Sequence, residues 1–122
     1  MFAAVMSDEE NCKGFLERAL SMKIDRVEIN TEKNIVYHPE YKGVRLDVYA
    51  KDENNTRYNI EMQVLKQPAL GRRSRYYQSQ MDMELLLKGC EYAELPDSYV
   101  IFLCDFDFGR RMNRYLLLNI GM

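Results

Sequence analysis

The chain has 122 residues, of which 47% are hydrophobic, so it is large enough to bury one core and too short for two. Its formal net charge of −2 lacks the basic excess common in nucleic-acid-binding domains, although arginines cluster locally at 72–75 and 110–114. No apolar stretch approaches the ~20 residues of a membrane-spanning helix. The three widely spaced cysteines argue against a disulfide framework or a zinc site, and they indicate reduced thiols in a cytoplasmic protein.

The N-terminal part predicts one helix and two short extended segments. Residues Ser7-Asp8-Glu9-Glu10 are typical of a capped helix start, and the apolar residues that follow recur at helical spacing (Cys12, Phe15, Leu16, Ala19 and Leu20). Extended pieces are expected at Val27–Asn30 and Ile35–Tyr37, on either side of a polar turn.

Two alternating segments in the centre of the chain predict a β-hairpin. Val44–Ala50 and Tyr58–Val64 each alternate apolar and polar residues, and the segment between them is polar. Side chains two positions apart share a face of a strand, so the apolar residues of both segments are expected on one face (Val44, Leu46, Val48, Ala50, Ile60, Met62 and Val64). The acidic residues then lie on the other face, away from the main core.

The register of this hairpin decides which acids meet. A loop centred on Asn54 places Asp47 directly opposite Glu61, with Cβ atoms about 4.5–5.5 Å apart. A shift by one pair would place Asp47 opposite Gln63 instead. Like charges this close are destabilising unless a positive charge lies between them, and a hard divalent cation such as magnesium is held by carboxylates of this kind. A solvated hairpin face with two ordinary acids is the alternative interpretation.

The second half predicts a long helix followed by a strand. The helix begins near Gln67-Pro68 and ends at Lys88-Gly89, where glycine stops it. Pro96-Asp97 then turns the chain into a strand over Ser98–Cys104. The apolar tail, Leu116–Ile120, either adds one more strand or docks on a partner protomer, and it also suggests a fragment of a longer protein.

The central motif resembles that of a known nuclease family. Asp47, a turn and then Glu61-Met62-Gln63 is similar to the PD-(D/E)XK nuclease motif in its Asp…Glu-x-Gln variant, and more narrowly to the recombination-promoting nuclease and nuclease family transposase group. The likeness runs from about Ser7 to about Phe108, and its supporting segments are Arg75-Tyr76-Tyr77-Gln78-Ser79 and Leu87-Lys88-Gly89-Cys90-Glu91-Tyr92. It implies an α/β fold with a restriction-endonuclease-like core, a small mixed sheet flanked by helices in the order helix, three strands, helix, strand. A single domain over residues 1–122 is expected, as the N-terminal part of a longer family architecture.

The resemblance implies a metal-dependent DNA endonuclease that hydrolyses phosphodiesters and is linked to transposition or recombination. Asp47, Glu61 and Gln63 would be catalytic. Magnesium or manganese would be held by Asp47, Glu61 and the backbone carbonyl of Met62, with Glu10 as the candidate for a third carboxylate. Gln63 stands where most relatives carry lysine, so the positive charge must come from the metal or from the following helix.

The following helix supplies the candidates for DNA contact. Arg72 and Arg75 would bind phosphates, and either the metal or one of these two arginines would supply the missing positive charge. Tyr77 and Gln78 would lie near the active site, although packing of Tyr77 against the sheet is an equal alternative. DNA is the expected partner, no membrane association is expected, and pairing of two protomers stays open. The alternative function is a catalytically inactive domain of the same fold that binds nucleic acid or protein.

Overall fold

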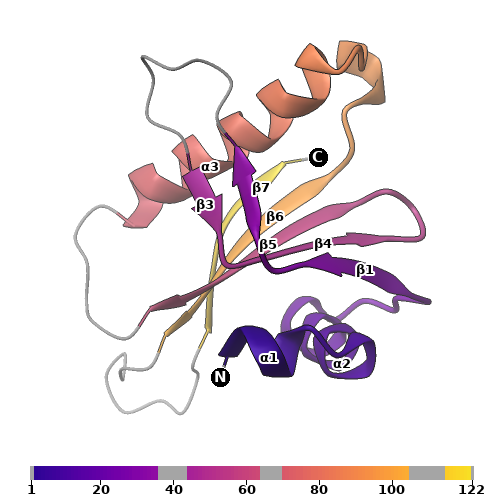
Figure 1. The fold of residues 1–122 in the computed structure, drawn as a ribbon, viewed down its shortest axis with the longest axis vertical. Helices are drawn as coiled ribbons and strands as arrows, with labels where there is room; N and C mark the ends of the chain where they lie inside the picture. Colours follow the sequence, from indigo (N-terminus) through magenta and orange to yellow (C-terminus); the bar gives the residue numbers. More distant parts are fainter. Residues whose placement is uncertain (1, 36–43, 64–69, 105–114, 122) are drawn as a thin grey trace.

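The computed structural model describes residues 2–35, 44–63, 70–104 and 115–121. Figure 1 shows a central twisted sheet with helices on both of its faces. The elements in chain order are α1 (Phe2–Met6), α2 (Glu9–Leu20), β1 (Val27–Asn30), β2 (Lys33–Ile35), β3 (Val44–Leu46), β4 (Val48–Asp52), β5 (Arg57–Gln63), α3 (Leu70–Leu87), the 3₁₀ turn η1 (Tyr92–Glu94), β6 (Ser98–Cys104) and β7 (Tyr115–Gly121).

Five strands form one mixed sheet in the order β1-β4-β5-β6-β7. β5 and β6 are parallel, because α3 connects them as a crossover, while the other neighbouring strands pair antiparallel. β2 and β3 pair with each other as a separate two-stranded arm. The expected mixed sheet flanked by helices is confirmed. The apolar tail, for which an extra strand was one of two predictions, forms β7.

Helices cover both faces of the sheet, so the sheet contributes to two cores (Figure 1). The α2 core joins Cys12 and Leu16 of α2 to one face of the sheet, at Val48, Ala50, Tyr58, Ile60 and Ile101. The α3 core joins Met81 of α3 to the opposite face, at Leu46, Tyr49, Val100 and Phe102. The face on which the acids were expected is therefore partly covered by α3 and Glu61 is buried on it, so the interpretation as a solvated hairpin face is wrong.

The predicted strand Val44–Ala50 is interrupted at Asp47. The residues before Asp47 form β3 and pair with β2, whereas those after it form β4 and pair with β1 and β5. The bend also changes which side chains face which core, because Leu46 lies in the α3 core and Val48 in the α2 core. On a regular strand two such residues share a face. The prediction of one unbroken strand with both side chains on one face is therefore wrong.

The predicted register of the hairpin is confirmed. Lys51 pairs with Arg57, and Val48 pairs with Ile60, so the loop is centred on Asn54. The register follows from the apolar pattern. A shift by one residue would turn Val48 and Ile60 to opposite faces of the sheet, whereas both lie in the α2 core.

One buried carboxylate organises the hairpin loop. Oδ1 of Asp52 accepts the backbone N–H groups of Asn54 and Thr56, each at 2.9 Å, and Oδ2 accepts the hydroxyl of Tyr58 at 2.7 Å. Asn55 adopts the left-handed conformation with φ of 69°, which asparagine tolerates better than most residues. The loop is thereby fixed by side chains of its own sequence.

The predicted start of α2 and the predicted end of α3 agree with the structure, and the predicted start of the second helix at Gln67-Pro68 lies outside the described residues. α2 begins after Asp8, whose Oδ1 accepts the Asn11 N–H at 3.1 Å. α3 is followed by Gly89 with φ of 100°, whose N–H donates to the Leu86 carbonyl at 3.0 Å. The second predicted extended piece begins earlier than expected, as β2 at Lys33, and its residues 36 and 37 lie outside the described ranges. No helix in these ranges is both long and apolar enough to span a bilayer.

Candidate active site

Asp47 and Glu61 come together at the point where the strand bends. The register of β4 and β5, extended by one pair, places them opposite each other. Oε2 of Glu61 accepts the Asp47 backbone N–H at 2.9 Å, and Oδ2 of Asp47 accepts the Met62 backbone N–H at 3.2 Å. These two bonds cross between the strands and use one oxygen of each carboxylate. The bend at Asp47 therefore fixes the orientation of both acids.

Burial makes Glu61 an unusual carboxylate. Its side chain lies on the face of the sheet that packs against α3, beside Phe102, and the residue is only 4% exposed. Burial raises the pKa of Glu61 to about 7, from an ordinary value of 4.5. The Asp47 N–H lowers this pKa, whereas the negative charge of Asp47 raises it and the positive charge of Arg73 lowers it. Near neutral pH, Glu61 therefore needs a further positive charge to be fully ionised.

Arg73 is the arginine of α3 that faces the site, and sequence reasoning selected its neighbours Arg72 and Arg75 instead. Nη2 of Arg73 donates to the Tyr77 hydroxyl at 2.8 Å. The guanidinium lies 5.6 Å from the centroid of the Tyr77 ring and 6.0 Å from that of Phe102, the residue that pairs with Glu61. Helical spacing carried the missing signal, because Arg73 lies four residues before Tyr77, which packs on the sheet.

Asn59 brings an unpaired amide to the same face of β5. Its side chain is fully buried. Neither of its polar atoms makes a hydrogen bond of standard geometry within the described part of the chain, yet the amide lies near enough to Glu61 to lower the pKa of that carboxyl. Buried amides without partners are rare. Asn59 is therefore available as a hydrogen-bonding group for Glu61 or for a group bound beside it.

The residues present fit a divalent cation. Asp47 and Glu61 are hard oxygen ligands, lie on adjacent strands and each keep one oxygen outside their mutual hydrogen bonds. A cation beside them would offset both the repulsion between the two charges and the burial that raises the pKa of Glu61. The orphaned amide of Asn59 indicates that the polar shell around Glu61 is not completed by the described residues alone.

The remaining predicted metal ligands are placed as follows. Met62 donates its N–H to Asp47, and the role of its carbonyl stays a prediction. Gln63 ends β5, and its side chain lies outside the described part of the structure. Glu10 is exposed in the first turn of α2, the helix that covers the opposite face. Within the described residues no third Asp, Glu, His or Cys joins the pair, so Glu10 does not fit as a ligand.

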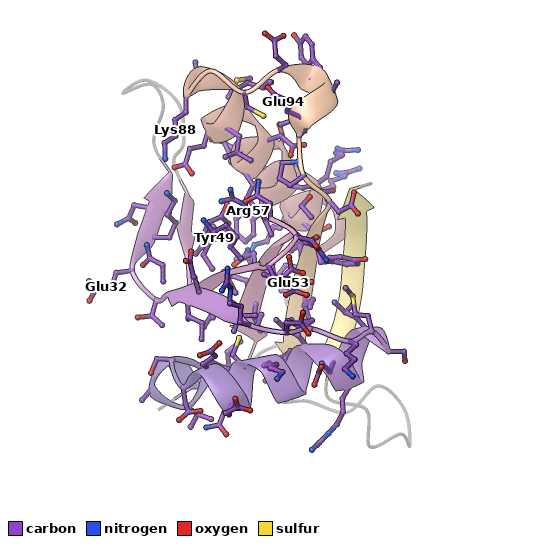
Figure 2. The ribbon with its side chains drawn as sticks, turned by 90° about the vertical axis from the view of Figure 1, so that its right-hand side faces the viewer. Glu32, Tyr49, Glu53, Arg57, Lys88 and Glu94 are labelled. Carbon is purple, nitrogen blue, oxygen red and sulfur yellow. The ribbon has the colours of Figure 1, made fainter. Side chains whose placement is uncertain are left out.

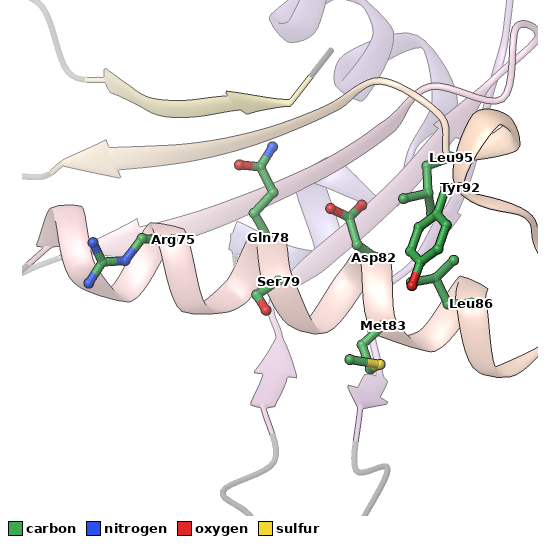
Figure 3. A pocket seen from close by; sticks show the side chains of 8 residues that line it. All are labelled: Arg75, Gln78, Ser79, Asp82, Met83, Leu86, Tyr92 and Leu95. Atoms are coloured by element: carbon green, nitrogen blue, oxygen red, sulfur yellow. The ribbon is translucent and has the colours of Figure 1, made fainter.

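The predicted DNA contacts do not all lie on open surface. Arg72 and Arg75 are exposed, and Figure 3 shows Arg75 at one end of a cavity of about 400 Å³ along α3. Tyr77 packs against the α3 core, which was the alternative to a DNA contact. Gln78 is 7% exposed, and its Nε2 donates to the Ser98 hydroxyl at 2.7 Å and carbonyl at 3.2 Å. It ties α3 to the start of β6, and this placement does not support a DNA contact.

Comparison with known proteins gives one finding for the chain. The family model of the PD-(D/E)XK nuclease family transposases matches residues 1–120. No curated protein and no solved structure gives a significant match. The family match spans both the Asp47–Glu61 pair and the sheet that holds it, in agreement with the resemblance of the Asp…Glu-x-Gln motif and with the mixed α/β fold. The chain therefore belongs to the PD-(D/E)XK nuclease family transposases.

Proposed function

We propose that this protein is a metal-dependent DNA endonuclease linked to transposition or recombination. The observation that supports the proposal is the pair of crossed hydrogen bonds that orients Asp47 and Glu61 toward each other in a largely buried site. In a purely structural pair, the repulsion between two opposed acids would work against the gain from these hydrogen bonds. A nuclease needs it, because two fixed acids can hold a divalent cation at a scissile phosphate.

Each residue of the site has a separate task in this proposal. Asp47 and Glu61, together with the carbonyl of Met62, would hold magnesium or manganese, which would supply an acidified water and stabilise negative charge on the phosphate. Met62 fixes one oxygen of Asp47 through its N–H, and Asp47 fixes one oxygen of Glu61 in the same way. Gln63 orients the attacking water by hydrogen bonding.

Arg73 supplies the fixed positive charge that Gln63 cannot. Its guanidinium is held by Tyr77 and lowers the pKa of Glu61, so it favours the ionised carboxylate that the cation requires. Arg72 and Arg75, which are exposed on other faces of α3, would contact DNA phosphates away from the acidic pair.

A catalytically inactive domain that binds nucleic acid or protein is the second candidate. One observation favours it: glutamine stands at position 63, where most relatives carry the lysine of the motif. Under this proposal the crossed hydrogen bonds would only stabilise the bend at Asp47, and no cation would be needed.

Nicking of supercoiled plasmid tests the proposal. Wild-type protein is compared with Asp47→Asn and Glu61→Gln, which remove the charge but keep an oxygen that can accept the observed hydrogen bonds. Glu53→Gln is the matched control, because Glu53 also accepts backbone N–H groups, from Asp25 and Arg26, at a different part of the sheet. Nicking that requires magnesium or manganese, persists in Glu53→Gln and disappears in the other two variants supports the proposal. Intact DNA binding without nicking by the wild type would favour the inactive domain.

A further inference from the structure

The face of the sheet that carries Glu61 is only partly covered by α3. α3 packs mainly on β6 and β7 and reaches the arm at β2. Beyond it, the outer part of β1, β4 and β5 forms a cavity of about 280 Å³. Its floor includes the cross-strand row Glu28–Lys51–Arg57, in which each residue is directly opposite the next. This cavity is separate from the acidic pair and plays no part in the function proposed above.

Two cations of this cavity flank one aromatic ring. Nζ of Lys33 lies 5.7 Å from the centroid of the Tyr49 ring, and the guanidinium carbon of Arg57 lies 6.0 Å from it. Figure 2 shows Tyr49 and Arg57 next to each other near the middle of the view. Arg57 is held in place by three hydrogen bonds, one to the Tyr49 hydroxyl and two to oxygens of Asn55. The positive groups are therefore preorganised.

The cavity carries more positive than negative charge. It is lined by three cations, Lys33, Lys51 and Arg57, and by one carboxylate, Glu28. Lys51 pairs with Glu28 at 3.1 Å, and Lys33 pairs with Glu84 of α3 at 2.9 Å. Within the described residues no carboxylate pairs with Arg57, whose hydrogen bonds all go to neutral oxygens.

Among the described residues, the two ion pairs offset the charges of Lys33 and Lys51 but leave that of Arg57 without an opposite charge. Lys51 and Arg57 lie directly opposite each other on neighbouring strands, and like charges in this relation repel. A forked guanidinium beside two ammonium groups matches the oxygens of a phosphate, which would neutralise the excess charge. This local positive charge contrasts with the net charge of the chain, which is −2.

We propose that this cavity binds a phosphate of the nucleic-acid backbone, as a second contact away from the scissile bond. This inference rests on the proposed function and names where the substrate is held. Arg57 and Glu61 are four residues apart on β5, which corresponds to about 13 Å along a strand. The bound phosphate therefore lies within a few nucleotides of the cleavage site.

The salt dependence of duplex binding tests this inference. Anisotropy of a labelled duplex is measured in EDTA, so that no cleavage occurs, over a series of salt concentrations. Loss of one phosphate contact lowers the slope of log Kd against log salt by about 0.9, and it weakens binding about fivefold at 0.15 M salt. We expect this loss in Arg57→Gln and Lys51→Gln. Arg18→Gln, an exposed arginine on the α2 side, is the control and keeps the wild-type slope.

Lys51 and Glu28 allow the charge of the cavity to be changed without disturbing the packing of Tyr49. Lys51 is partly exposed and pairs with the exposed Glu28, so Lys51→Gln remains informative even when Arg57→Gln loosens the packing of Tyr49. Glu28→Gln removes the competing carboxylate and should tighten duplex binding. Wild-type affinity and slope in both Lys51→Gln and Arg57→Gln would overturn the inference.

The source of the phosphate and the proposed activity are tested in the same series. Inorganic phosphate that raises the melting temperature of the wild type but not of Arg57→Gln, with duplex binding unchanged, would show a small-anion site and overturn the inference. Asp47→Asn should keep the wild-type slope. A protein that binds with the expected slopes but does not nick plasmid would retain this inference while the endonuclease proposal fails.

Discussion

Replacing Glu61 by glutamine should stabilise the metal-free protein at alkaline pH. The folded state raises the pKa of Glu61 from 4.5 to about 7, mainly through burial. Each tenfold difference in proton affinity between the folded and unfolded states is worth ~1.4 kcal/mol, so the ionised side chain costs about 3 kcal/mol when the folded protein must lose its proton. Glutamine of nearly the same shape removes that cost and still accepts the Asp47 N–H.

The sign of the effect follows from the direction of the pKa change. Below pH 4.5 the Glu61 carboxyl is protonated in both the folded and the unfolded state, and its contribution to the free energy of unfolding is fully present. Between pH 4.5 and about 7 the folded state keeps a proton that the unfolded chain has released, so stability falls as pH rises. The advantage of Glu61→Gln over the wild type should therefore be small at pH 4.5 and reach about 3 kcal/mol at pH 8.

Urea unfolding in EDTA at several pH values measures this difference. Glu53→Gln is the control of opposite sign, because backbone N–H groups lower the pKa of Glu53 and its contribution is lost as pH falls. That variant should not be stabilised at pH 8. A Glu61→Gln advantage that is the same at pH 4.5 and pH 8, or a destabilisation at pH 8, would refute the reasoning about burial.

Three other predictions concern the site and the hairpin. Magnesium should raise the melting temperature of the wild type at pH 8 and have little effect on Asp47→Asn, since a ligand stabilises only the state that binds it; equal shifts in both would contradict the site. Arg73→Gln should move the pH midpoint of nicking upward, because the positive charge of Arg73 lowers the pKa of Glu61, and Arg73→Lys should restore the midpoint. An unchanged midpoint in Arg73→Gln would exclude this effect of Arg73 on Glu61. Tyr58→Phe should lower the free energy of unfolding by about 1–2 kcal/mol, since it removes the buried 2.7 Å bond to Asp52, and an unchanged urea midpoint would contradict this.

Local rules of the sequence were sufficient to predict the hairpin and its register. The apolar pattern of the two strands and the asparagines of the loop act over a few residues, and together they allow few pairings. The pairing of Lys51 with Arg57 confirms the register that places Asp47 opposite Glu61. The end of α3 at Gly89 was predictable for the same reason, because the left-handed conformation there suits glycine.

Features that depend on packing between distant elements were not predictable in this way. The alternation of apolar residues continues through Asp47, so nothing in the pattern shows that Leu46 and Val48 belong to different cores. The burial of Glu61 depends on how β6 and α3 assemble on the same face of the sheet. Which of the three nearby arginines faces Glu61 depends on the rotation of α3 about its axis. In the structure this arginine is Arg73.

The crossed hydrogen bonds at the bend have a consequence for the order of folding. Asp47 and Glu61 are 14 residues apart in one hairpin, so their pairing needs only a short loop, and hairpins form in ~1–10 μs. Glu61 loses its water only when β6 pairs beside it and α3 docks on that sheet, and the β5–β6 pairing joins Glu61 to Phe102, 41 residues further along the chain. We expect the ionised carboxylate to oppose this later step, so that raising the pH speeds unfolding more than it slows refolding. A cation that binds the finished pair would then lengthen the lifetime of the folded state without changing how fast it is reached.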